Sequence, residues 1–338
     1  MIISVLKPGM LSTLQDSGRH GFQHFGVPLS GAMDAQSHRL ANLLAGNKSD
    51  EATLEITLRG PRLRFERDAL IALCGADFAA AIDGTRVAQA RPLRVRAGAT
   101  LDLGAARTGC RAYLAVHGGF AVPAVMGSRS TYVHAHIGGL HGRALREGDT
   151  LPIGLTQCAP YPLLASALAA SKLNFAAPRW AVNQHLEQLA RTPQIIRIVA
   201  GRQWDAFAPA ARDTLTSVEF RLAADSDRMG CRLEAATLNV QGIAEMLSEA
   251  VSFGTIQVPR SGQPIVLMAD RQTVGGYPKI AEVISVDLRL LAQLRPGERL
   301  RFELISLAQA QALYLQRERE NVTIGEAVAK QAKQWPNI

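Results

Sequence analysis

Short strands separated by turns recur through both halves of the chain, and this pattern limits the fold more than any other feature. In the first half the strand-like segments are TLEITL, RLRFE, ALIALCG, RVRAGATLDLG, CRAYLAVHGG and GDTLPIG. In the second half they are IIRIVAG, SVEFRL, TIQVP, PIVLMAD, AEVISVD and ERLRFELI. A spacing of about 8–12 residues, with Gly, Asp or Pro at the breaks, is typical of antiparallel barrels and sandwiches. The sequence therefore predicts a mainly β chain.

The chain is long enough for two such domains. It has 338 residues, 47% of them hydrophobic, and domains of roughly 100–200 residues can each bury a core. The fragments AGATLDL, EGDTLPI and PGERLRF share one turn-and-strand design, so related barrels are expected in both halves. We expect an N-terminal β domain at 1–157, an Ala-, Ser- and Pro-rich connection at 158–193, a C-terminal β domain at 194–305 and a helical tail at 306–338.

A few helices are also predicted. Ser30 is the expected N-cap of a helix that ends at Gly46 and Asn47. The segment LLASALAAS indicates one or two helical turns. Ser306 begins an amphipathic run, and Thr323 with Glu326 forms a capping-box pattern that predicts a separate last helix.

Composition argues against several classes of function. The net charge is +8, but the 37 Lys and Arg residues are scattered and aromatic content is 5%, so nucleic-acid binding is not expected. No window approaches the length of a membrane span, and the opening segment MIISVLKPGMLSTLQD is typical of a strand and not of a signal peptide. Four cysteines without a C-x-x-C pair fit a reducing cytoplasm, which is the expected location.

The densest chemistry follows a buried strand in the second half. Apolar residues 265–268 lead into Asp270, Arg271, Gln272 and Thr273, after which Gly275-Gly276 and Pro278 predict a turn. These side chains combine acceptors, a rigid five-donor guanidinium and backbone that a ligand can approach closely. A solvated turn is the alternative interpretation, but a second polar cluster, DSDRMG at 225–230, precedes it.

Other candidate sites are weaker. His134, His136 and His141 suggest a metal only if the H-x-H pair lies on a strand, and they have no clear carboxylate companion, so no metal is expected. No phosphate-binding loop and no biotin attachment sequence are present. Cys231, close to Arg228, is either a reactive thiol or a small buried side chain.

Several blocks in order along residues 3 to 305 resemble one known family. They are QDSGRHGFQHFGVPLSGAMD, ANLLAGN, ATLEITLRGP, GSRSTY, GGLHGRALREGD, SDRMGCRLE, TIQVPRSGQPIVLMADRQTVGGYPKIA and PGERLRF. The resemblance is to the biotin-dependent carboxyltransferase family that includes the C subunit of 5-oxoprolinase, KipA and allophanate hydrolase subunit 2. Two departures, Cys231 in place of a usual aromatic residue and Ala235 in place of a common glycine, concern local packing.

The resemblance implies two tandem cyclophilin-like β-barrel domains with a few helices. It also implies one component of a complex that opens 5-oxo-L-proline to L-glutamate with ATP hydrolysis, together with a KipI-type subunit and a lactam-utilisation-type subunit. Because this chain lacks a phosphate loop, ATP is expected to bind with or through the partners, and no biotin is expected on this chain. The alternatives are one half of a urea carboxylase or allophanate-type carboxyltransferase, and a KipA-type regulator that binds a KipI-type kinase inhibitor.

The family blocks coincide with the polar clusters, and this coincidence motivates a site hypothesis. The residues expected to carry catalysis are Asp270, Arg271 and Arg228. The residues expected to bind substrate are Asp16, Arg19, Gln257, Gln272, Gly275, Gly276 and Tyr277. One of the two arginines would hold a carboxylate or phosphate, Asp270 would orient an arginine or a water, and the glycines would bring backbone N–H groups to an anion. Structural ion pairs remain the alternative for the aspartates and arginines.

Overall fold

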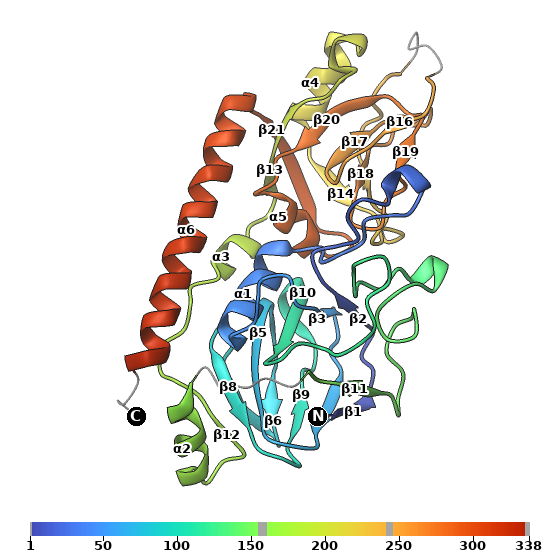
Figure 1. The fold of residues 1–338 in the computed structure, drawn as a ribbon. Coiled ribbons are helices and arrows are strands. Elements are labelled where there is room, and N and C mark those ends of the chain that lie inside the picture. The colour runs from blue at the N-terminus through green and yellow to red at the C-terminus, as the bar shows by residue number, and fades with distance from the viewer. Residues whose placement is uncertain (1, 155–160, 241–245, 335–338) are drawn as a thin grey trace. The chain divides into compact units, whose positions relative to one another are not determined.

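The computed structural model describes residues 2–154, 161–240 and 246–334 (Figure 1). Two compact units divide the chain. The first comprises Met1–Arg19, Asp34–Leu186 and Glu320–Ile338, and the second comprises His20–Met33 and Glu187–Arg319. This division differs from the linear one expected from the sequence, because residues 20–33 group with the second half and the tail contributes to both units. The physical reason for the first difference is that Met33 packs into the hydrophobic core of the second unit.

The first unit consists of two antiparallel six-stranded sheets that share one core. One sheet has the order β11-β1-β4-β9-β6-β7, and the other has the order β12-β8-β5-β10-β3-β2. The strands are β1 (Ile2–Lys7), β2 (Leu11–Gln15), β3 (Thr53–Thr57), β4 (Arg62–Phe65), β5 (Ala69–Phe78), β6 (Ala81–Ile82), β7 (Thr85–Arg86), β8 (Pro92–Val95), β9 (Thr100–Asp102), β10 (Ala106–Val116), β11 (Thr150–Pro152) and β12 (Phe175–Ala176). Leu63 from the first sheet and Ile71 and Leu114 from the second are fully buried in the common core. Burial of alternate apolar positions on facing sheets stabilises this arrangement.

Helix α1 (Ala35–Ala45) packs on the second sheet of this unit, against β5 and β10. Its N-cap is Asp34, whose carboxylate accepts hydrogen bonds from the backbone N–H of Ser37 (3.0 Å) and from its hydroxyl (2.6 Å). The predicted cap, Ser30, was wrong, since this residue lies before the helix with a positive φ of 56°. The predicted end is confirmed, because Gly46 closes the helix in the left-handed conformation with φ of 72°.

Three short helical segments of the first unit are η2 (Val133–Ala135), α2 (Pro162–Ala170) and the start of α3 (Leu186–Leu189). Helix α2 confirms the helical prediction for the LLASALAAS segment. His134 lies in η2 and not on a strand, so the premise that His134 and His136 would present both rings on one face of a strand was wrong.

A buried histidine on α1 makes the stability of the first unit dependent on pH. His38 is 2% exposed, and its Nδ1 lies 2.8 Å from the Thr53 hydroxyl. Burial lowers the pKa of His38 to about 4, although the charges of Asp16 and Glu55 oppose the shift. Because the folded pKa lies below the unfolded value of about 6.5, stability is fully present above that pH and falls as the pH drops from about 6.5 towards 4.

We therefore expect His38→Gln to flatten the dependence of Tm on pH between about 7 and 4 relative to the wild type. The measurement is thermal unfolding followed by circular dichroism at a series of pH values. The exposed His24 supplies the matched control, and His24→Gln should retain the wild-type profile. A His38→Gln profile parallel to that of the wild type would contradict the assignment.

The second unit is a closed seven-stranded barrel with the order β13-β20-β17-β18-β15-β14-β21. The strands are β13 (Gln194–Ala200), β14 (Phe220–Leu222), β15 (Gly230–Glu234), β17 (Thr255–Gln257), β18 (Ile265–Leu267), β20 (Lys279–Val283) and β21 (Arg299–Leu304). The β13–β21 pair is parallel, and the other neighbours are antiparallel. The prediction of a mainly β chain is therefore confirmed.

Smaller elements complete the second unit. The helical ones are η1 (Gln23–Phe25), η3 (Trp204–Ala206), α4 (Pro209–Ser217) and α5 (Leu288–Gln293). A two-stranded antiparallel ribbon, β16 (Glu249–Ala250) with β19 (Val274–Gly275), lies outside the barrel ladder and contributes to the polar cluster described below (Figure 1).

The C-terminal tail is one long helix, α6 (Leu307–Gln334), drawn in red in Figure 1. Ser306 and Gln309 form its capping box, since Gln309 N–H donates to the Ser306 hydroxyl (3.2 Å) and Ser306 N–H donates to Gln309 Oε1 (2.9 Å). The start predicted at Ser306 is confirmed. The separate helix predicted from Thr323 and Glu326 was wrong, because no proline interrupts the run and helical hydrogen bonding continues through both residues.

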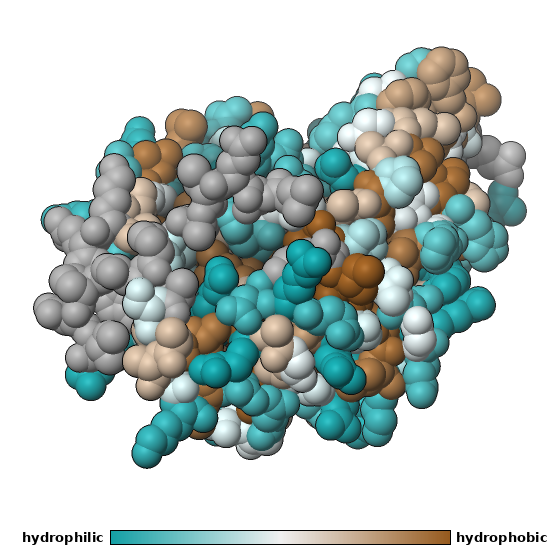
Figure 2. Space-filling view, turned by 60° about the horizontal axis from the view of Figure 1, so that its bottom comes forward, coloured by the Kyte–Doolittle hydropathy of each residue, from teal (hydrophilic) through white to brown (hydrophobic). Residues whose placement is uncertain are grey.

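On the face shown in Figure 2, hydrophilic and hydrophobic residues are interspersed. Within the described ranges, no helix combines the length and the apolar character needed to cross a membrane.

Candidate functional site

The two polar clusters predicted in the second half meet at one place in the second unit. Strand β18 ends at Leu267, and the chain then turns through residues 268–273. Met268 N–H donates to the carbonyl of Met229 (2.9 Å), and Asp270 N–H donates to the carbonyl of Arg228 (2.8 Å). These backbone bonds extend the β15–β18 pairing beyond both strands, so they place the side chains of Asp270 and Arg228 together.

Arg228 and Asp270 form a buried ion pair. The distances are 2.9 Å from Arg228 Nε to Asp270 Oδ2 and 3.2 Å from Nη2 to Oδ1, and Nη2 also donates to the carbonyl of Gly31 (2.6 Å). The residues are 6% and 2% exposed. Asp270 therefore orients Arg228, and the arginine fastens the 20–33 segment to the barrel of the second unit. These contacts indicate a structural role for the Arg228 guanidinium.

Arg271 has a different environment. It is 5% exposed, its Nε and Nη1 donate to the carbonyls of Val251 (3.4 Å) and Met268 (3.3 Å), and its guanidinium carbon lies 5.8 Å from the centre of the Phe253 ring. In the described part of the chain, no carboxylate forms an ion pair with it within 4.0 Å. Burial lowers the pKa of Arg271, and the charge of Glu282 opposes this effect. A desolvated cation with carbonyl and aromatic partners is suited to an anionic ligand.

Glu282, on β20, was not among the predicted site residues. Its carboxylate accepts hydrogen bonds from the hydroxyls of Ser252 (2.9 Å) and Thr255 (2.9 and 3.0 Å). Burial raises the pKa of Glu282, although these hydroxyls and Arg271 partly offset the rise. The available signal was a lone glutamate within the apolar strand sequence KIAEV, where an acidic side chain needs partners.

Gln257, Gln272 and Gly275 come together beside Arg271. Gln272 Nε2 donates to Gln257 Oε1 at 3.4 Å, and Gln257 on β17 is 2% exposed. A side chain at Gly275 would collide with this amide, because its Cβ would lie 2.4 Å from Gln257 Nε2. Gly276 has more room, with its nearest neighbour 3.5 Å from an added Cβ, and Tyr277 is 48% exposed on the same turn.

Lys279 and Glu249 are further members of this cluster that sequence reasoning missed. Lys279 is 2% exposed, and its Nζ donates to the carbonyls of Gly275 (3.2 Å) and Tyr277 (3.3 Å) and lies 3.4 Å from Glu249 Oε2. Glu249 reaches this position through the β16–β19 ribbon, where it pairs with Gly275. The lysine therefore fixes the turn that carries Tyr277. A lysine at the start of a buried strand was the only local signal.

Asp16 and Arg19 lie in the first unit, where they form hydrogen bonds with residues 125–130. Asp16 accepts hydrogen bonds from the hydroxyls of Ser128 (2.7 Å) and Ser130 (2.5 Å) and from the N–H groups of Gly18 (2.9 Å) and Arg129 (2.5 Å). Burial raises the pKa of Asp16, but these hydrogen bonds outweigh it and lower the pKa overall. Arg19 is fully buried and donates to the carbonyls of residues 125 (3.0 Å) and 130 (2.8 Å). Their part in substrate binding stays a prediction.

The cysteine and histidine candidates form neither an exposed thiol nor a metal-ligand cluster among the described residues. Cys231 is 4% exposed in the core of the second unit, which favours the small buried side chain over the reactive thiol. Cys74 and Cys110 are also buried, and Cys158 lies outside the described residues. Among the residues that the structure describes, no group of three or more His, Cys, Asp and Glu could hold a metal ion.

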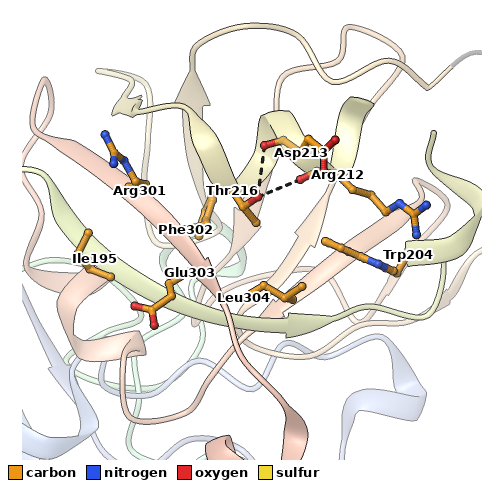
Figure 3. Close-up of a pocket in the computed structure, with 9 residues that line it drawn as sticks. All are labelled: Ile195, Trp204, Arg212, Asp213, Thr216, Arg301, Phe302, Glu303 and Leu304. Atoms are coloured by element: carbon orange, nitrogen blue, oxygen red, sulfur yellow. Dashed lines mark hydrogen bonds between the residues drawn. The ribbon is translucent and has the colours of Figure 1, made fainter. Parts of the chain in front are cut away.

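A pocket of about 490 Å³ on the second unit is lined by none of the predicted site residues (Figure 3). It is lined by Ile195, Trp204, Arg212, Asp213, Thr216, Arg301, Phe302, Glu303 and Leu304. The Arg212 guanidinium lies 5.8 Å from the centre of the Trp204 ring, and the Thr216 hydroxyl donates back to carbonyls of α4. The Arg212 guanidinium and the Thr216 hydroxyl are thus engaged within the protein.

Comparison with known proteins places this fold in a family. A carboxyltransferase domain, subdomain A and B, is matched over residues 25–304. The chain belongs to this carboxyltransferase family. The match begins in the segment that packs against the barrel of the second unit and ends with β21, so both described units contribute to the family domain.

Relatives within the carboxyltransferase family carry two kinds of name. The chain is 39% identical over 309 residues to a protein of Escherichia coli named as the C subunit of 5-oxoprolinase, with 91% of this chain and 93% of that protein covered. It is 38% identical over 312 residues to a protein of the same name from Haemophilus influenzae, with 92% and 94% covered. A crystal structure of the K. lactis urea amidolyase is similar with a TM-score of 0.79 and 28% identity, over 98% of this chain and 20% of that one.

Proposed function

We propose that this chain is one component of an ATP-dependent 5-oxoprolinase complex that opens 5-oxo-L-proline to L-glutamate. The observation that carries the proposal is the match to two proteins named as the C subunit of 5-oxoprolinase, over 93% and 94% of their own lengths. A match over nearly the whole length of these relatives supports the proposal that this chain takes the same role in a complex as they do. The urea amidolyase, by contrast, corresponds to this chain over only 20% of its length.

The polar cluster of the second unit supports this substrate. 5-Oxo-L-proline carries one carboxylate and one neutral lactam. Arg271 is a buried cation without a carboxylate partner among the described residues, so it fits the substrate carboxylate. The ion pair of Asp270 with Arg228 holds the loop that carries Arg271. We propose that Gln272, the two glycines and Tyr277 complete this site in the second unit. The part of Asp16 and Arg19 of the first unit in substrate binding is a separate proposal, which the family blocks suggest.

The chemistry explains why such a chain works with others. A lactam is a poor electrophile, and transfer of the γ-phosphoryl group of ATP to its oxygen makes the ring carbon reactive and releases ADP. Water then adds to that carbon, the C–N bond breaks as a proton reaches the nitrogen, and a second water hydrolyses the acyl phosphate to carboxylate and phosphate. Positioned donors stabilise the charge that develops on oxygen.

We propose that partners supply what this chain lacks. Its sequence contains no phosphate-binding loop, so ATP is proposed to bind with or through two partners, one of the KipI type and one of the lactam-utilisation type. The two relatives are named as one lettered component of an enzyme, and this name supports the existence of other components.

The test is release of glutamate from 5-oxo-L-proline and ATP. This chain alone is expected to release none, and the mixture with both partner types is expected to release glutamate and ADP in equal amounts. The measurement is coupled detection of glutamate and ADP, with each partner omitted in turn. Absence of glutamate from a mixture of folded partners would rule out the proposal.

A carboxyltransferase that accepts carboxybiotin from another chain is the second candidate. It is favoured by the similarity to the K. lactis urea amidolyase over 98% of this chain. Transfer of labelled carboxyl groups from carboxybiotin to urea in the presence of this chain would support it. The same assay without the chain gives the background rate.

A further inference from the structure

The side-chain amide of Gln257 is a buried donor that the described fold does not use. Gln257 is 2% exposed, and its Nε2 has no hydrogen-bond partner among the described residues. Its Oε1 has one long contact, 3.4 Å from Gln272 Nε2. A buried donor left without a partner destabilises a protein by about 1–3 kcal/mol, so an apolar side chain would serve the fold better. The amide therefore points to a ligand.

Gly275 lies directly against this donor, and only a residue without a side chain fits there. Its φ is not in the left-handed region, so the backbone conformation does not require glycine. Crowding does, because an added Cβ would lie 2.4 Å from Gln257 Nε2. Gln272, partly exposed and held to Gln257 only by the long contact, is the neighbour that can move aside for a ligand.

The charges around Gln257 favour a neutral group at this point. Lys279 is opposite Gln257 in the β17–β20 ladder, and its ammonium is matched by Glu249 at 3.4 Å and by two backbone carbonyls. Arg271, adjacent in sequence to Gln272, forms no ion pair within 4.0 Å among the described residues, although the charge of Glu282 acts on it. The ammonium beside Gln257 is thus matched by a carboxylate, whereas the Arg271 guanidinium has no carboxylate at that distance.

We propose that the carboxamide of Gln257 binds the amide group of the substrate. A lactam presents its C=O and N–H on the same edge, as urea does, and a glutamine carboxamide offers a donor and an acceptor on one edge in the complementary order. Nε2 donates to the substrate oxygen, and Oε1 accepts from the substrate N–H in place of Gln272. The identification of this amide as the lactam of 5-oxo-L-proline rests on the proposed function.

Calorimetric titration tests the proposal with 2-pyrrolidone, which has the lactam without the carboxylate, and with 5-oxo-L-proline and urea. The full chain and its complex with the partner subunits are both titrated. Gln257→Leu is expected to weaken binding of 2-pyrrolidone at least about tenfold, which corresponds to about 1.4 kcal/mol. Its Tm should stay equal to that of the wild type or rise, because a buried unpaired donor is removed.

Gln263→Leu is the matched control. The amide of Gln263 pairs with both backbone groups of Ala235, at 3.1 and 3.3 Å, so this variant should lower the Tm and keep binding. Wild-type affinity of Gln257→Leu for 2-pyrrolidone would overturn the proposal, as would the absence of binding by the wild-type chain and its complex. Loss of binding together with a fall in Tm equal to that of Gln263→Leu would also overturn it. If 2-pyrrolidone or urea binds through Gln257 while the complex releases no glutamate, the amide site stands and the 5-oxoprolinase assignment fails.

Discussion

Replacing Asp270 by alanine is expected to lower the free energy of unfolding by about 3–5 kcal/mol, because it leaves the Arg228 guanidinium buried without its counter-charge. The pair is 6% and 2% exposed and joined by two hydrogen bonds, so water cannot compensate for the missing carboxylate. Arg228 also holds the carbonyl of Gly31, and the loss should extend to the packing of residues 20–33 on the barrel. Urea denaturation followed by circular dichroism measures the effect.

The control for this prediction is an ion pair of the same charge types on the surface. Arg221 and Glu234 lie on neighbouring strands of the same barrel, with side chains 59% and 48% exposed. Glu234→Ala should change the free energy of unfolding by about 1 kcal/mol or less. A loss for Asp270→Ala no larger than the loss for Glu234→Ala would contradict the structural role of the buried pair.

A double substitution separates the charge from the contact. Combining Arg228→Met with Asp270→Leu removes both charges and retains apolar volume, so it should cost less than the sum of the single substitutions Arg228→Met and Asp270→Leu. An additive result would show that the two residues stabilise the protein independently.

The strands and the polar loop were predictable because their signals are local. Alternation and turn residues define strands such as β4 and β21 without reference to the rest of the chain. The loop after Leu267 was predictable because polar residues follow an apolar strand directly. Ser30 and Asp34 are both good N-cap residues, so the sequence alone could not decide where the helix starts. The hydrogen bonds from Ser37 to Asp34 decide it in the structure.

The missed residues depend on long-range pairing. Glu249 approaches Lys279 because β16 pairs with β19, and nothing near residue 249 in the sequence indicates that partner. In the same way, Met33 joins the core of the second unit, whose strands lie far along the chain. Local patterns specify which segments are strands and which side chains carry chemistry. The register between distant strands then decides which of those side chains meet.

Replacing Arg271 by alanine is expected to leave the chain folded and to reduce kcat/KM for 5-oxo-L-proline in the reconstituted complex at least about a hundredfold. Loss of a buried charge-assisted contact typically costs about 2–5 kcal/mol, and about 2.8 kcal/mol corresponds to that factor. Folding should persist because Arg271 forms no ion pair with the described residues and burial already lowers its pKa. Arg271→Lys keeps the charge but loses the planar fork, so partial activity is expected.

Two comparisons make the Arg271 result specific. Arg221→Ala removes an exposed arginine from the same unit and should retain full activity. Calorimetry should show that Arg271→Ala weakens binding of 5-oxo-L-proline and leaves binding of 2-pyrrolidone unchanged, since only the former carries a carboxylate. Wild-type turnover by Arg271→Ala would remove this residue from the site. Equal weakening for both ligands would instead assign it a role in positioning the loop, because an arginine that binds the carboxylate cannot influence a lactam without one.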